Sequence, residues 1–539
     1  MSAKNESTEP IRISAQQRVQ SELDPTGLCI TNRIENWKPS ETAIIVCDMW
    51  DKHWCNDATT RVAEFAPVLD KVLTIARNKG VTIVHAPSDC MDFYKNSPAR
   101  KRALQYMDKK IAAITNSGGK LPSEENAAWP IDDSDGGCES NKEPDNHHVW
   151  SRQIATLTID ESKDLISDNG AESASYFKKK GIKNVILTGV HTNMCVVGRS
   201  FALRAMKKVG MNVVLMRDMT DLMYNHEKAP FVNHFSGLDL MVEYIETYIC
   251  PTIVSSDFTG EKQFKFKGDT RKRIAFVTAE SEYRANQRLP EFAHELTLKN
   301  IHCDFALGIP IMSEAKKDAD AKVKAEYAAY GMPIEPKGNT LPPSRHNLEN
   351  LQILEDANLA VIFIRRRALE PEKMKAIKDY VTSGRPLLGI RTASHAFDAK
   401  ANVPRSGGGI ETAKENASDL LAQWPDLDKD VWGGNYKGHY GHLKTGTDVT
   451  LVPGMENHPI LKDVTPFNSP NWLYQNRPLR TDKAQVLLLG SNPGVPNEPV
   501  LWINGKNVIY TSLGHWDDWK IESFKTLMFN TVNYLLSNK

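Results

Sequence analysis

The sequence predicts an α/β protein with two doubly wound, mostly parallel sheets in tandem, each packed between helices as a three-layer αβα domain. The chain has 539 residues, which is too long for a single hydrophobic core. Short apolar runs alternate with amphipathic helical patterns in both halves. A polar, lysine-rich stretch at 256–271 separates the halves and resembles a linker. We therefore expect an N-terminal arm at 1–40 and domains at 41–255 and 272–539.

Composition describes a globular chain without a strong electrostatic preference for a partner. Lys plus Arg and Asp plus Glu each number 67, so no net field favours nucleic acid or an anionic membrane. No apolar run reaches the roughly twenty residues needed to cross a bilayer, and Met1–Pro10 lacks a signal core. We expect a cytoplasmic protein, although an exported protein without its signal peptide has the same features. The eight cysteines contain no Cys-x-x-Cys pair, which argues against a zinc ribbon and a thioredoxin-like site, and at this density no disulfide framework is expected.

The elements of the first half follow in order. Residues before 41 are polar, with a turn signal at 24–27, and predict an arm on the domain surface. Residues 41–48 form a buried-strand pattern, 61–78 a helix that ends at Gly80, and 81–85 the next strand. The polar, turn-rich stretch 95–150 is predicted to be a lid over a site. A helix at 170–180 and a strand at 184–188 then lead to one amphipathic helix at 194–209, which ends at Gly210.

Cys195 lies where that strand turns into that helix. Unpaired backbone N–H groups and the helix dipole at such a turn favour a thiolate and are able to hold an oxyanion. A lone cysteine is more often a small buried side chain. However, Asp48 ends the strand at 41–48, and the carboxyl ends of parallel strands face one crevice. The sequence therefore predicts that Asp48 and Cys195 meet, with Cys195 as nucleophile and Asp48 as proton acceptor.

Together, Asp48 and the spaced set Gly189, Thr192, Cys195 and Val196 resemble the isochorismatase-like cysteine hydrolases. The resemblance implies a catalytic lysine, for which Lys163 is the best-placed match and Arg152 and Lys142 are rivals. It also implies a cis peptide bond between Val190 and His191, with the turn through Cys195 forming the oxyanion hole.

Substrate contacts are predicted from the residues around the two motifs. Trp50 and Trp54 are predicted to form an aromatic wall of the pocket, although tryptophans near a strand end are as often simple packing. His191 and Asn193 are predicted to contact substrate. For His191, a hydrogen bond to nearby backbone is an equally good interpretation.

The sequence lacks the spacing of metal ligands that is found in related nicotinamidases. The nicotinamidases of the family carry an Asp-x-His and a second histidine as ligands, whereas Asp51, His53 and His85 lack that spacing. We predict no metal and no other cofactor.

The second half repeats the strand and helix alternation. Strands are expected at 274–278, 359–364 and 386–390, helices at 284–300 and after Pro371, and a hairpin at 499–511 that turns at Asn504-Gly505. Polar inserts occupy 313–344 and 399–441.

The hairpin and the Gly514-His515 that follows it, with Glu282-Tyr283, residues 389–395 and Trp432-Gly433-Gly434, resemble the trehalose-utilisation (ThuA-like) proteins, which share the class I glutamine amidotransferase fold. Amidotransferases need a cysteine after the strand that ends near Ile390, and this chain has Arg391 there, which excludes glutamine hydrolysis. A pocket is predicted from Glu282, Tyr283, His395, His439 and His515. The family name implies a carbohydrate-related ligand, and a scaffolding or dimerisation role is weighed equally.

The leading hypothesis is a hydrolase that cleaves an amide or related C–N bond of a small metabolite. Cys195, Asp48 and Lys163 form its triad, and a thioester acyl-enzyme is its intermediate. The alternative is an inactive isochorismatase-like binding or assembly module, with a carbohydrate-related function in the ThuA-like half. Because both families commonly associate, we expect a homo-oligomer.

Overall fold

The structure is a computed structural model of the chain and describes residues 9–20, 27–140, 148–280, 283–308, 348–404, 410–414, 421–440 and 445–537. Contacts within the chain define two compact units. The first comprises Met1–Arg18, Asn32–Arg271 and Thr297–Asn300, and the second comprises Val19–Thr31, Lys272–Leu296 and Ile301–Lys539. Among the described helices, none has both the length and the apolar character that crossing a bilayer requires.

The first sheet has eight strands within the described residues, in the order β2-β1-β8-β7-β6-β3-β4-β5. The strands from β8 to β5 pair in parallel, whereas β1 joins β8 antiparallel. Their bounds are β1 Ile11–Gln20, β2 Leu28–Trp37, β3 Thr42–Cys47, β4 Thr82–Ala86, β5 Leu165–Ile166, β6 Asn184–Val190, β7 Asn212–Asp221 and β8 Thr252–Ile253.

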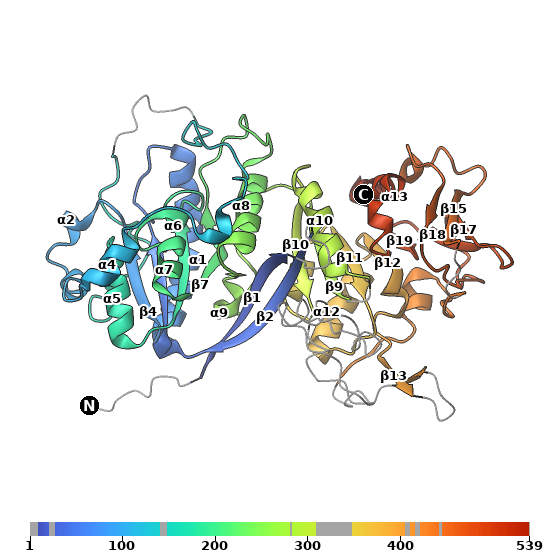
Figure 1. The fold of residues 1–539 in the computed structure, drawn as a ribbon, viewed down its shortest axis with the longest axis horizontal. Coiled ribbons are helices and arrows are strands. Elements are labelled where there is room, and N and C mark those ends of the chain that lie inside the picture. The colour runs from blue at the N-terminus through green and yellow to red at the C-terminus, as the bar shows by residue number, and fades with distance from the viewer. Residues whose placement is uncertain are drawn as a thin grey trace. The chain divides into compact units, whose positions relative to one another are not determined.

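Helices occur between the strands of this sheet along the chain (Figure 1). Their bounds are α1 Asn56–Lys79, α2 Met91–Tyr94, α3 Pro98–Ala103, α4 Lys109–Thr115, α5 Gly170–Lys180, α6 Cys195–Gly198, α7 Leu203–Val209, α8 His234–Tyr248 and α9 Ser256–Thr259. The predicted helices at 61–78 and 170–180 are confirmed as α1 and α5. Gly80 ends α1 in the left-handed conformation, with φ 99°, that a glycine C-cap supplies.

Two expectations for the first half are wrong. The polar residues before 41 include β1 and β2, the two long blue strands in Figure 1, and Ile11, Ile13 and Ala15 of β1 are buried in the core. The stretch 256–271 includes α9 and buried Phe258 and Phe266, so it packs as part of the first core rather than as a linker. The average composition of these two segments is polar, and this composition led to both wrong expectations. A few alternating apolar residues are enough to bury one face of a strand or turn.

The second sheet is parallel from β10 to β19 and antiparallel beyond it, in the order β10-β9-β11-β12-β19-β18-β17-β15-β16. Its strands are β9 Arg273–Ala279, β10 His302–Leu307, β11 Leu359–Ile364, β12 Leu387–Ile390, β15 Thr447–Leu451, β16 Phe467–Ser469, β17 Ala484–Ser491, β18 Glu498–Asn504 and β19 Val508–Thr511. Strands β13 Lys400–Pro404 and β14 Ile410–Lys414 form a separate pair. The predicted hairpin is β18–β19, and Gly505 has φ 70° in its turn.

Helices cover both faces of this second sheet. Ile274 and Phe276 of β9 belong to one core cluster with α10 Ala285–Thr297 and α13 Glu522–Ser537, while Ala275 and Val277 belong to another with α12 Pro371–Thr382. Side chains that alternate between two helical layers define a three-layer domain. The predicted class is confirmed as two mixed sheets flanked by helices. The insert predicted at 313–344 lies outside the described residues.

Candidate active site

The cysteine loop, residues 189–195, follows the end of β6. Gly189 has φ 97°, and a Cβ there would lie 2.0 Å from the carbonyl oxygen of Cys47 on β3, so only glycine fits. The N–H and hydroxyl of Thr192 both donate to the carbonyl of Asp221 at the end of β7, at 2.8 and 2.9 Å. The Val190–His191 peptide bond is cis, the geometry that the family resemblance implies. These contacts place Cys195 as the first residue of α6.

Asp48 and Cys195 meet at the carboxyl ends of β3 and β6. The two strands are parallel neighbours with Cys47 opposite Gly189. Asp48 is fully buried, adopts φ 44°, and lies close enough to Cys195 for its charge to raise the pKa of the thiol. The N–H of Ser88 donates to Oδ1 of Asp48 at 2.7 Å.

The protonation state differs from the predicted thiolate. Burial raises the pKa of Cys195 to about 12, with the charge of Asp48 as the next cause, while Arg199 opposes both. Burial also raises the pKa of Asp48 above its ordinary value, against Arg199 and the hydrogen bonds from Cys195 and Ser88. Helix α6 has only four residues, so its dipole is weak and desolvation dominates. The resting pair is a thiol beside a buried carboxyl group.

Arg199, rather than Lys163, is the cation that contacts Asp48. Its Nε donates to Asp48 Oδ2 at 3.3 Å, and its charge acts to lower the pKa of Cys195. Lys163 is exposed in the turn before β5, where its backbone N–H donates to Asp160. It is therefore not the buried ammonium expected beside the thiol. The rival Arg152 places its guanidinium over the ring of Phe93, and Lys142 lies outside the described residues.

A break in the predicted 194–209 helix brings Arg199 to the site. The helix stops at Gly198, Arg199 is extended with ψ 158°, and α7 begins only at Leu203. Ser200 at the break accepts a hydrogen bond from the N–H of Gly170 on α5. The apolar period of the sequence continues across this break, so periodicity alone predicted one helix.

An aromatic wall borders Cys195. Trp50 and Trp150 stack with ring centroids 4.3 Å apart, and the Trp50 N–H donates to the carbonyl of Ser88. Cys195 and Trp150 both pack against a buried cluster that contains Trp50 and Tyr94. Trp150 comes from the predicted lid and was not identified in the sequence, because a tryptophan in a polar insertion carries no positional signal. Trp54 instead packs in a neighbouring cluster with Cys55 and Cys138.

Two loop residues predicted to touch substrate have structural contacts. The amide of Asn193 donates to Asp133 of the lid and to the carbonyl of Met223, and it accepts from the N–H of Met223. His191 is buried, its ring meets that of His53 edge-on at 4.8 Å, and its Nε2 has no hydrogen-bond partner. Burial holds the pKa of His191 well below its ordinary value, so the ring is neutral.

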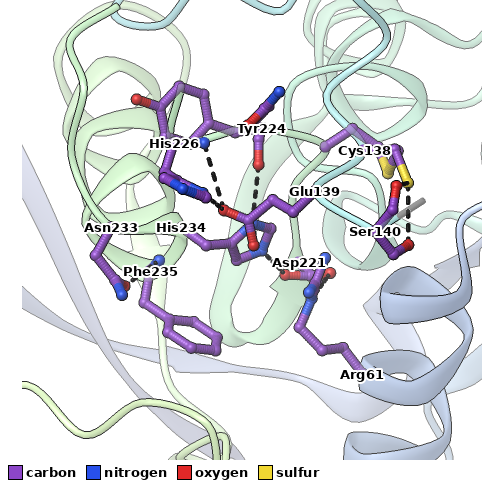
Figure 2. Close-up of polar contacts among 12 residues, drawn as sticks. Arg61, Cys138, Glu139, Ser140, Asp221, Tyr224, His226, Asn233, His234 and Phe235 are labelled. Atoms are coloured by element: carbon purple, nitrogen blue, oxygen red, sulfur yellow. Dashed lines mark hydrogen bonds and ion pairs between the residues drawn. The ribbon is translucent and has the colours of Figure 1, made fainter. Parts of the chain in front are cut away.

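A buried ion cluster supports the cysteine loop from β7. The carboxylate of Asp221 contacts Arg61 Nε at 2.7 Å and His234 Nε2 at 2.9 Å, and Figure 2 shows Arg61 and His234 on either side of it. Burial acts to raise the pKa of Asp221, but Arg61 and His234 hold it well below its ordinary value. The lid residue Glu139 binds His226 nearby. Asp221 thus links the loop, through its carbonyl, to an ionised network.

One disulfide ties the lid to the site. Cys55, just before α1, is bonded to Cys138, a single disulfide that the argument against a disulfide framework did not anticipate. Their separation of 83 residues hides the pairing in the sequence. The disulfide and the Asn193–Asp133 contact both anchor the segment 133–140.

The three residues considered as metal ligands have separate environments. Asp51 accepts from Ser151, His85 lies between Gln153 and Asp164, and His53 packs among aromatic rings. Across the described ranges, no group of three or more His, Cys, Asp and Glu side chains is placed to hold a metal ion.

The predicted pocket of the second unit is partly present. A cavity of about 810 Å³ is lined by Tyr283, His395 and His439, among others. His515 is not among its lining residues and instead packs against Trp516 and Tyr283. Glu282 lies outside the described residues. Arg391, where amidotransferases have their cysteine, is buried with φ 45°.

No family model and no curated protein matches the chain. Among solved structures, a cysteine hydrolase from Pseudomonas syringae pv. phaseolicola 1448A is 15% identical, with a TM-score of 0.25, and the match covers 41% of this chain and 91% of that one. A nicotinamidase pyrazinamidase from Acinetobacter baumanii is 14% identical, with a TM-score of 0.21, over 41% and 98%. A putative ThuA-like protein from Parabacteroides merdae ATCC 43184 is 12% identical, with a TM-score of 0.29, over 50% and 91%.

Proposed function

We propose that the first unit is a cysteine hydrolase that cleaves an amide or related C–N bond of a small metabolite. The observation that carries the proposal is that the partly exposed Cys195 follows β6, beside the end of β3, and that the charges of buried Asp48 and of Arg199 both act on the pKa of its thiol. Arg199 Nε in turn donates to Asp48 at 3.3 Å. A nucleophile next to a general base, with a third group that orients the base, is the arrangement that acyl transfer requires.

The chemistry follows from the contacts. Asp48 accepts the thiol proton as the sulfur attacks the carbonyl carbon, and then gives that proton to the leaving amine. This leaves a thioester on Cys195. Water, deprotonated by Asp48, attacks the thioester and releases the acid and the thiol. Arg199 stabilises the negative charge on the sulfur and the carboxylate, which is the role that the resemblance implied for a lysine.

The substrate is proposed to have a flat or apolar body next to its amide. The stacked Trp50 and Trp150 form a rigid apolar wall beside the sulfur, and Tyr94 extends it. A planar acyl group lying along this wall would present its carbonyl to Cys195.

A panel of small aromatic and aliphatic amides, carbamates and ureides tests the proposal by release of ammonia or amine. Replacement of Cys195 by Ala should abolish any activity found, whereas Cys303→Ala, at a partly exposed thiol of the second unit, should retain it. Asp48→Asn should lower the rate by a factor of about 100 to 10,000. Activity that survives Cys195→Ala would favour the alternative, in which the first unit is a binding or assembly module.

A further inference from the structure

Residues 132–140, which we call the strap, lie along the segment that follows β7. The backbone N–H of Asp132 donates to the carbonyl of Ala229 at 2.8 Å. The carboxylate of Asp135 accepts a hydrogen bond from the side chain of Asn225 at 2.9 Å. Strand β7 is the parallel neighbour of β6, which carries the cysteine loop. The strap is therefore fastened beside the loop, at the same edge of the sheet.

The far end of the strap is held by Glu139 and by a disulfide. One carboxylate oxygen of Glu139 lies 3.0 Å from His226 Nδ1, and the other lies 3.8 Å from His234 Nδ1; Figure 2 shows Glu139 beside both histidines. Cys138, the only cysteine of the strap, is bonded to Cys55 just before α1. Polar contacts near solvent contribute little to stability. The disulfide is therefore the strongest tie of this end.

Asp133 connects the strap to the cysteine loop. It accepts a hydrogen bond from Asn193 Nδ2 at 2.8 Å. The same amide group donates to the carbonyl of Met223 and accepts from its N–H, each at 2.9 Å. A Cβ on Gly137 would lie 2.3 Å from the backbone of Met223, so the strap packs directly against that residue. Asn193, two residues before Cys195, is thus held by the strap and by the segment under it.

Reduction of the disulfide would leave the strap with noncovalent ties alone. A dithiol supplies two electrons and two protons, breaks the S–S bond to give two protein thiols, and becomes a cyclic disulfide itself. Segments that are held by a few hydrogen bonds near solvent open locally at a small cost in free energy. An open strap no longer presents Asp133 to Asn193.

We propose that the strap is a redox-controlled clamp on the cysteine loop: the disulfide keeps Asp133 on Asn193, and reduction by a dithiol loosens the loop that carries Cys195. Asp133 and Asn193 are then positioning residues, because they act through the loop and not on a substrate. The effect on turnover rests on the proposed hydrolase function, since a displacement of about 1 Å in a reacting group lowers a rate about 100-fold. The effect on the loop itself requires no activity.

Hydrogen exchange of the full chain, followed by mass spectrometry, tests the clamp without a substrate. Dithiothreitol should make the amides of residues 189–196 exchange at least tenfold faster and leave those of β3 unchanged. The double variant Cys55→Ser/Cys138→Ser should already exchange at the faster rate, and dithiothreitol should not change it further. A disulfide that dithiothreitol does not reduce in the folded protein, or a reduced protein with unchanged exchange in the loop, would overturn the proposal.

Variants of the strap separate positioning from folding. Asp133→Ala should make the loop amides exchange at least tenfold faster, whereas Asp133→Asn should keep most of the protection, because its amide oxygen still accepts from Asn193. Asp132→Ala is the matched control, since the Asp132 side chain accepts from the N–H of Ser134 within the strap. Equal exchange in Asp133→Ala and Asp132→Ala would contradict the role of Asp133.

Turnover provides the second measurement. On a substrate whose cleavage depends on Cys195, reduction should lower kcat at least tenfold and change KM less than threefold, because the loss is one of geometry. Reduction should have no effect on turnover of the Cys55→Ser/Cys138→Ser variant. Faster loop exchange without any Cys195-dependent turnover would support the clamp and contradict only the hydrolase function. Full turnover of the reduced protein would contradict the clamp.

Discussion

At the scale of single residues, the proposed chemistry depends on which cation accompanies Asp48 and Cys195. The sequence predicted that Asp48 and Cys195 lie close together, because an aspartate and a cysteine that follow adjacent parallel strands share one edge of the sheet. It did not identify Arg199, because the cation is placed by a break in the chain after Gly198 rather than by any local pattern. Lys163 matched the family by position, yet its side chain is exposed.

The assignment of the cation makes a direct prediction. Arg199→Gln should lower Cys195-dependent turnover by about 10- to 1,000-fold, because a charge-assisted contact of about 1.5 to 3 kcal/mol or more is lost from the transition state. Arg199→Lys should restore part of the rate, since it keeps the charge but not the planar geometry. The control is Lys163→Gln, which should retain most activity. A larger loss in Lys163→Gln than in Arg199→Gln would return the role to Lys163.

Protonation was the residue property that the sequence could not supply. The prediction of a thiolate treated α6 as a full helix, but the structure shows a single short turn, and burial of the partly exposed cysteine raises the pKa of its thiol. Burial and a neighbouring carboxylate both disfavour a second negative charge. The pKa of the thiol depends on how much water reaches the sulfur, and the order of residues in the sequence does not give this information.

At the scale of elements, most strands and helices that frame the site were predictable. Strands such as β3, β6 and β11 are buried on both faces and read as continuous apolar runs. The failures have a common cause. β1 and β2 mix polar and apolar residues, and α6 and α7 share one apolar period across a break, so local patterns could not show the tertiary contacts that decide their shape.

Substitution of Gly189 tests whether the close approach of β3 and β6 positions the cysteine loop. Gly189→Ala should reduce the free energy of unfolding by about 2 to 5 kcal/mol, because the new Cβ meets the Cys47 carbonyl in a left-handed backbone. Gly181→Ala is the matched control: it also has a positive φ, 73°, but nothing lies within 4 Å of its Cβ position. Denaturant titrations should show a loss of only about 1 to 2 kcal/mol there. Equal losses in the two variants would mean that the close approach of the strands is not what selects glycine.

At the scale of the whole molecule, two units with separate cores are expected to unfold in separable steps. The first core cluster contains the buried residues of β3, β6 and α1, while those of β9 to β12 fall in two other clusters. The predicted homo-oligomer depends on the surface of the protein, and the predicted cellular location depends on targeting signals. The two hydrophobic cores give no information about either. They remain predictions.

Acid stability gives the whole-molecule prediction. Because the folded pKa of Asp221 is lowered, its ion cluster stabilises the first unit fully above about pH 5, and this stabilisation is lost as the pH falls through and below about 4. Asp221→Asn should therefore cost about 3 kcal/mol at pH 7, and the difference from wild type should shrink toward pH 3. Calorimetry should show the change in one transition only, and exposed Asp92→Asn should show none. A pH-independent difference would mean that the cluster is not ionised as described.

The measurement that tests the central claim most directly is the pH dependence of iodoacetamide labelling at Cys195, followed by peptide mass spectrometry. If Asp48 accepts the thiol proton, a small population of thiolate paired with protonated Asp48 exists at all pH values between the two pKa values, because the pair titrates as a unit. The account predicts that wild-type Cys195 is labelled faster than Cys47 and Cys303, at a rate nearly constant from pH 6 to 9. In Asp48→Asn the rate should be lower at pH 6 and should rise about tenfold per pH unit. Identical profiles in the two proteins, or labelling of Cys195 no faster than of Cys303, would contradict a Cys195 nucleophile activated by Asp48.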